Sequence, residues 1–165
     1  HADDIENLLK FVNDSLKDDG IFIGIDFFGP TRFQIEYDVF PIIQELFDIL
    51  PDDLRRDLRT SDMPVRNNFR RPTVREVVTA DQSESVRSSD LRTLLLSNFP
   101  IHDVKPMGGT LLRWLFQYIA GNFDDANPDH VAIAKLLQFI EREMISSRRI
   151  RSDDLFFCLG KSDCL

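Results

Sequence analysis

Residues 21–39 have the sequence IFIGIDFFGPTRFQIEYDV and determine how much β-structure we expect in the chain. The first part, 21–28, is short, rich in β-branched residues and followed by Gly29 and Pro30, which is typical of a buried strand. The second part, 33–39, alternates apolar and polar residues, which favours a second strand and a β-hairpin. The same residues also fit a helical stripe that continues past Pro41, so strand and helix both stay open over 33–39.

Helical periodicity dominates the rest of the chain. Apolar residues recur at helical spacing over 3–18, 41–50, 89–99, 111–120 and about 128–149. The segment 111–120 is apolar almost all round, which places it at the centre of the fold. We therefore expect a mainly α, helix-dominated α+β fold with room for a small β-hairpin near 21–39. The alternative is an all-α bundle.

The length and composition predict one globular helical domain over residues 1–165. A chain of 165 residues that is 42% hydrophobic buries a substantial core without disulfides. Residues 60–72 are dominated by Ser, Asp, Pro, Asn and Arg and predict an exposed loop. Residues 158–165 are expected to fray, and the two cysteines there, Cys158 and Cys164, are too close together to cross-link much of the fold.

Two further features bear on the location of the protein. No apolar run approaches the roughly 20 residues of a membrane span, and the first residues lack the basic and apolar regions of a signal peptide. The chain does not begin with Met, which suggests a segment of a larger polypeptide. We expect a cytoplasmic or nuclear protein without a membrane partner.

Charge is distributed unevenly along the chain, within a net charge of -8. Residues 1–54 carry 13 acidic and 3 basic side chains, whereas 55–92 carry 6 acidic side chains and 9 basic ones, all Arg. Arg offers planar, bidentate contacts to phosphate or carboxylate groups, so this segment is a candidate contact surface. Pairing with the acidic first part of the chain is the alternative. The candidate binding residues are Arg55, Arg56, Arg59, Arg66, Phe69, Arg70, Arg71 and Arg75.

Thr73 follows Arg70, Arg71 and Pro72, an order typical of sites of basophilic kinases. A phosphate there would offset the local positive charge. Thr73 is therefore a candidate phosphorylation site.

Two short motifs bear on catalysis. Residues 22–30 resemble the first core strand of RNase H-like nucleases and retroelement integrases, and this resemblance implies that Asp26 binds a catalytic metal. Such chemistry needs further carboxylates on neighbouring strands, which the sequence does not predict, so we favour Asp26 at the surface or capping the turn at Gly29. The pair His102-Asp103 resembles HD phosphohydrolases but lacks the upstream His of their metal site. We predict no catalytic residue, no metal and no cofactor, and hence a protein that is not an enzyme.

These observations favour a protein-interaction module, an adaptor, scaffold or assembly domain of a larger intracellular protein. We expect it to offer a helical groove or the Arg-rich segment to a protein partner or to a second copy of itself. The alternative is an RNA-binding or nucleic-acid-processing domain that uses residues 55–75, although the overall acidity disfavours non-specific nucleic-acid binding. No membrane and no small-molecule cofactor is expected among the partners.

Overall fold

The computed structural model describes residues 4–163, which form two compact units that interleave along the sequence. The sheet unit consists of the described chain up to Ile35, Pro72–Met107 and the described chain from Ser152. The helical unit consists of Glu36–Arg71 and Gly108–Arg151. The prediction of one domain over 1–165 stays a prediction.

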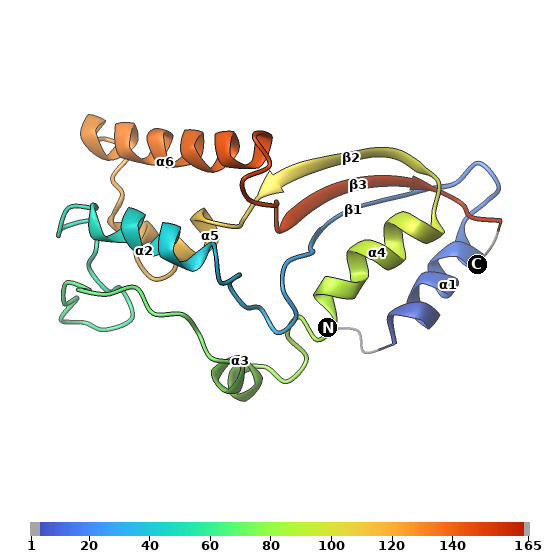
Figure 1. The fold of residues 1–165 in the computed structure, drawn as a ribbon, viewed down its shortest axis with the longest axis horizontal. Helices are drawn as coiled ribbons and strands as arrows, with labels where there is room; N and C mark the ends of the chain where they lie inside the picture. Colours follow the sequence, from blue (N-terminus) through green and yellow to red (C-terminus); the bar gives the residue numbers. More distant parts are fainter. Residues whose placement is uncertain (1–3, 164–165) are drawn as a thin grey trace. The chain divides into compact units, whose positions relative to one another are not determined.

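Each unit has its own secondary structure (Figure 1). The sheet unit contains α1 (Ile5–Ser15), β1 (Ile21–Phe27), α3 (Val74–Ala80), α4 (Ser88–Asn98), β2 (Ile101–Gly108) except its last residue, and β3 (Asp154–Gly160). The helical unit contains α2 (Phe40–Asp48), α5 (Leu112–Leu115), the short 3-10 helix η1 (Ala120–Asn122) and α6 (Pro128–Ser146).

The three strands form an antiparallel sheet in the order β1-β3-β2, so β3 is the central strand. The β1–β3 register runs from Ile21 opposite Gly160 to Phe27 opposite Asp154. Helices α1 and α4 pack on the same face of the sheet (Figure 1). Their contact with the sheet forms a core of buried apolar residues: Ile5, Leu9, Phe28, Leu95, Phe99, Leu155, Phe157 and Leu159.

Capping side chains fix the starts of α1 and α6. The Asp4 side chain accepts a hydrogen bond from Asn7 N (3.2 Å) at the start of α1, and the Asn127 side chain accepts one from Asp129 N (3.0 Å) at the start of α6. In α2, Pro41 occupies the first turn, where a missing N–H costs no helical hydrogen bond. These three helices confirm the predicted segments 3–18, 41–50 and 128–149, with bounds that differ by a few residues, since α2 begins one residue earlier, at Phe40.

The predicted fold class is wrong. Residues 4–163 are 40% helical and 15% strand, with a three-stranded antiparallel sheet and 6 helices, so the protein is mixed α+β, neither helix-dominated nor an all-α bundle. The predicted hairpin near 21–39 does not form, because the chain turns at Arg32 and Phe33, whose φ angles are 63° and 50°, and 33–39 contains no strand. β1 instead pairs with β3, from the opposite end of the sequence.

Two further expectations need correction. Residues 158–160 of the tail expected to fray belong to β3, where Leu159 is fully buried. Cys164 lies outside the described residues. The helix expected over 111–120 is limited to α5, and Tyr118 beyond it has a left-handed φ of 68°. Its apolar residues are nevertheless at the centre of the helical unit, since Trp114 is among the fully buried side chains.

A buried carboxylate organises the start of α5. Glu141 of α6 accepts hydrogen bonds from Leu111 N (2.7 Å) and Leu112 N (3.1 Å), which have no partner within a helix that begins there. Gly108 and Gly109 precede this turn with φ angles of 87° and 82°. Glu141 is therefore part of the scaffold of the helical unit.

Candidate functional site

The structure divides the predicted Arg-rich site between the two units. Residues 55–71 belong to the helical unit, whereas Thr73 and Arg75 belong to the sheet unit. Within the helical unit, some guanidinium groups are hydrogen-bonded or stacked on rings of the same unit, and others are exposed.

Arg55 and Arg66 serve the interior of the helical unit. Arg55 forms an ion pair with Asp52 and donates to Arg66 O (3.4 Å). Arg66 donates to Gln117 O (2.9 Å), and its guanidinium lies 5.2 Å from the centroid of the Phe47 ring. Burial lowers the pKa of Arg66, and the carboxylate of Asp57 acts in the opposite direction. Both side chains thus connect loops of the helical unit through hydrogen bonds to backbone carbonyls.

Arg59 is held by Asp57 and by an aromatic ring. Its Nε donates to Asp57 Oδ1 (2.9 Å), and its Nη2 donates to Asp57 Oδ2. The guanidinium lies 4.2 Å from the centroid of the Tyr118 ring. The hydrogen bonds from Arg59 lower the pKa of the largely buried Asp57 to about 2. This bidentate geometry, which we predicted for a ligand, is satisfied within the unit.

Phe69 is part of the core and not of the surface. It is 4% exposed, and its ring centroid lies 5.9 Å from that of Phe40 and 6.0 Å from that of Phe47. The predicted contact through Phe69 would require opening of this core. The neighbouring Arg71 lies 4.2 Å from the ring centroid of Tyr37.

The remaining predicted residues are exposed. Arg56 and Arg70 lie at the surface of the helical unit, and Arg75 lies on α3 of the sheet unit. Thr73 caps α3: its hydroxyl accepts from Glu76 N (3.2 Å) and donates to Glu76 Oε2 (2.8 Å). The predicted phosphorylation site is therefore an exposed hydroxyl already used in a capping box.

The sheet unit has a candidate site outside the residues predicted from the sequence, the open edge of β1. Phe28 N donates to Asp153 O (2.6 Å) and continues the β1–β3 ladder. Because hydrogen-bonded and non-hydrogen-bonded pairs alternate in an antiparallel ladder, the backbone groups of Ile21, Ile23 and Ile25 point away from β3. Phe27 N also points away from β3, and it donates a hydrogen bond to Asp26 Oδ1 (2.7 Å). The open edge thus extends over 21–25.

The side chains of the same three residues are exposed on the face of the sheet opposite the α1–α4 core. Ile21, Ile23 and Ile25 are 53%, 52% and 61% exposed. They alternate with Phe22 and Gly24, which lie on the same face as the buried Leu159 and Phe157. Within the sheet unit, the described helices α1 and α4 both lie on the other face (Figure 1). The strand predicted as buried is therefore covered on one face only.

Asp26 does not gain the partners that the nuclease resemblance implies. Its side chain is exposed and caps Phe27 N, not the turn at Gly29. Among residues 4–163, no group of three or more His, Cys, Asp or Glu side chains is placed to hold a metal ion. In this part of the chain, no helix has both the length and the apolar character needed to cross a membrane.

Comparisons with protein-family models, curated proteins and solved structures find no match for the chain. The sequence signal for the β1 edge is the alternation of three isoleucines in 21–25, without a charged residue or proline among them.

Proposed function

We propose that the chain is a protein-interaction module that assembles by strand addition at β1. The observation that supports this function is the open edge over 21–25, where unpaired backbone groups coincide with the exposed side chains of Ile21, Ile23 and Ile25. In strand addition, main-chain hydrogen bonds provide affinity, and alternate side chains provide specificity. β1 offers both along the same five residues.

The chemistry of β1 defines its partner. Natural edge strands usually carry lysine, proline, a bulge or an inward-pointing charge that prevents pairing with another strand. Residues 21–25 carry none of these, and the charge that follows, Asp26, is placed beyond the open segment. The partner that fits is an extended strand with apolar side chains at alternate positions and no charge between them.

β1 itself meets this description. In an antiparallel pair centred on Ile23, Ile21 of one copy lies opposite Ile25 of the second, and both copies use the same surface. The exposed isoleucines of the two copies then lie side by side on one face of a continuous sheet. Self-association is thus the first form of assembly to test, and an adaptor or scaffold role uses the same edge for a strand of another polypeptide.

The main test measures the oligomeric state of the chain as a function of concentration by analytical ultracentrifugation. Wild type is expected to dimerise, and Ile23→Lys is expected to raise the dimer Kd by about tenfold or more, because it places a charge at the centre of the pair. Ile101→Lys is the matched control, since Ile101 is 53% exposed on β2, the strand at the other edge. It should leave the Kd unchanged.

A second variant separates edge pairing from folding. Ile25→Pro removes an outward N–H that β3 does not use, so the β1–β3 ladder should persist while pairing at the edge is lost. A peptide with the sequence of 21–27, extended by lysines for solubility, tests strand addition directly by fluorescence anisotropy. A chain that stays monomeric at every concentration and does not bind the peptide would show that the proposal is wrong.

The nucleic-acid alternative has less support. Arg55, Arg59 and Arg66 of its predicted site are engaged by groups of the helical unit, so they offer few free donors to phosphate. Binding of RNA at low salt that disappears in Arg56→Glu with Arg70→Glu, and not in Ile23→Lys, would favour that alternative over assembly.

A further inference from the structure

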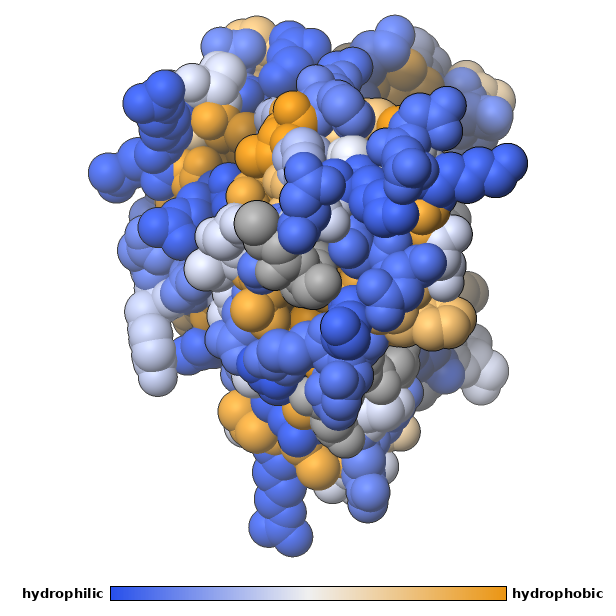
Figure 2. Space-filling view, turned by 90° about the vertical axis from the view of Figure 1, so that its right-hand side faces the viewer, coloured by the Kyte–Doolittle hydropathy of each residue, from blue (hydrophilic) through white to orange (hydrophobic). Residues whose placement is uncertain are grey.

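A cavity of about 650 Å³ lies in the sheet unit, on the face of the sheet that α1 and α4 cover. Its walls include Ile5, Leu8, Leu9 and Val12 of α1 and Leu91 and Leu95 of α4, and rings from β1 and β3 complete them. Figure 2, which views the side on which α1 lies in Figure 1, shows apolar side chains at the surface among hydrophilic ones. The size and lining are those of sites for small organic molecules.

Ser88, the first residue of α4, lines this cavity, and its buried hydroxyl is unsatisfied. The residue is 6% exposed, and its buried Oγ has no hydrogen-bond partner among the described residues. Buried hydroxyl groups are almost always hydrogen-bonded, because leaving one unpaired costs free energy. A polar group of a bound molecule is a partner that this hydroxyl lacks in the protein.

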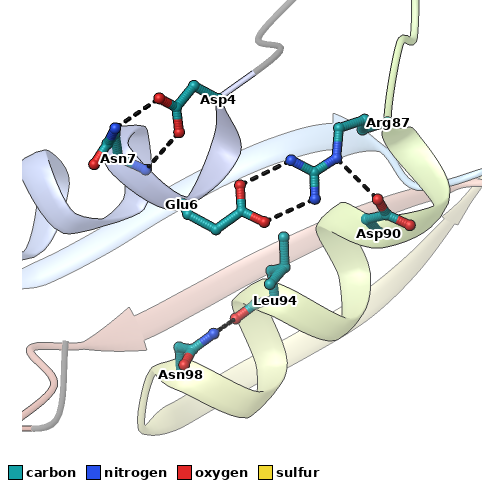
Figure 3. Close-up of polar contacts among 7 residues, drawn as sticks. All are labelled: Asp4, Glu6, Asn7, Arg87, Asp90, Leu94 and Asn98. Atoms are coloured by element: carbon teal, nitrogen blue, oxygen red, sulfur yellow. Dashed lines mark hydrogen bonds and ion pairs between the residues drawn. The ribbon is translucent and has the colours of Figure 1, made fainter.

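Charge at the cavity distinguishes between head groups. Arg87 is the basic residue of the lining, and it donates two hydrogen bonds to Glu6 (2.7 and 2.8 Å) and one to Asp90 (2.9 Å) (Figure 3). Its charge is thus balanced by two carboxylates. The lining also contains Asp26 and Glu84, which makes the local charge negative. A carboxylate ligand would be repelled there, whereas an ammonium group would be attracted.

We propose that this cavity binds a small amphipathic amine, with its apolar body between α1 and α4 and its ammonium group donating to the carboxylate of Asp26 and to Ser88 Oγ. An ammonium group has three donors and no acceptor. It can therefore donate to Asp26 Oδ2, to which no described residue donates, and to Ser88 Oγ. The site is independent of strand addition, since it lies on the opposite face of the sheet from the exposed isoleucines.

The test titrates the full chain with decylamine, decanol and decanoic acid below their micelle concentrations, with isothermal titration calorimetry as the readout. One decylamine is expected to bind per chain, more tightly than decanol, and decanoic acid is expected to bind most weakly. Asp26→Asn should weaken decylamine by about five- to tenfold and leave decanol unchanged. The asparagine retains the acceptor for Phe27 N, so β1 should keep its structure.

Three further variants complete the experiment. Ser88→Ala should weaken decylamine and decanol alike, and Val12→Phe should abolish both by filling the cavity. Asp14→Asn on α1 is the matched control, because Asp14 is exposed and lies outside the cavity lining, and it should bind decylamine like wild type. Decanoic acid binding as tightly as decylamine, decylamine binding that Val12→Phe does not reduce, or no saturable binding at all would overturn the proposal.

Discussion

The two edges of the sheet differ in whether their residues allow another strand to pair with them. At the β2 edge, Lys105 Nζ pairs with Asp103 Oδ2 at 2.7 Å, and Pro106 follows directly, so this edge strand carries charged side chains and a proline. At the β1 edge, 21–25 carries three exposed isoleucines and no such device. One sheet therefore has a protected edge and an open edge, and only the open edge is suited to assembly.

The largest expected effect comes from a substitution in β3, the central strand with which both edge strands pair. Leu159 of β3 is fully buried in the sheet core, so Leu159→Ala should lower the free energy of unfolding by about 2–5 kcal/mol. Urea denaturation followed by circular dichroism measures this change. The matched control is Leu136→Ala, at a position that is 58% exposed, which should cost less than about 0.5 kcal/mol. Equal effects at the two positions would contradict the core described here.

An intermediate effect is expected when the protected edge is made to resemble the open one. Lys105→Ile combined with Pro106→Val removes the charge and restores an N–H on β2. A molecule with two open edges can pair without closure, so the variant should form large assemblies where wild type stops at a dimer. Light scattering measures the mass, and an unchanged mass would show that these two residues do not protect the β2 edge.

The smallest effect concerns the covered face and should leave both edges unaltered. Hydrogen bonds from Arg87 lower the pKa of Glu6 from 4.5 to about 2. A depressed carboxyl pKa contributes stability that is present above about 4.5 and is lost as the pH falls through about 2. Glu6→Gln should thus have a slightly lower urea midpoint than wild type near neutral pH, with a difference that disappears near pH 2. Its dimer Kd should match that of wild type.

Strand β1 was predictable from local sequence, whereas its partners in the sheet were not. Residues 21–28 have a dense apolar pattern, and the structure places β1 there. β2 contains Pro106 and charged side chains, which are typical of loops, and it becomes a strand because β3 lies beside it. The alternation over 33–39 predicted a strand that does not form, since pairing across the length of the chain determined the sheet.

The candidate site residues could likewise be found in the sequence, but their contacts could not. The Arg-rich composition of 55–75 is evident in the sequence, but the contacts of Arg59 with Tyr118 and of Arg66 with Gln117 O join segments far apart in the chain. Conversely, the alternation of Ile21, Ile23 and Ile25 is visible in the sequence. Their exposure is not, because it depends on which face of the sheet α1 and α4 cover.

The pairing of Ile21 with Gly160 has a consequence for synthesis on the ribosome. β1 leaves the exit tunnel early, but its partner β3 emerges only after the whole helical unit has been translated. Contacts between residues so distant in sequence form slowly, and until then both sides of β1 are unpaired. A chaperone that binds short apolar segments would therefore be expected to act on the nascent chain at residues 21–25.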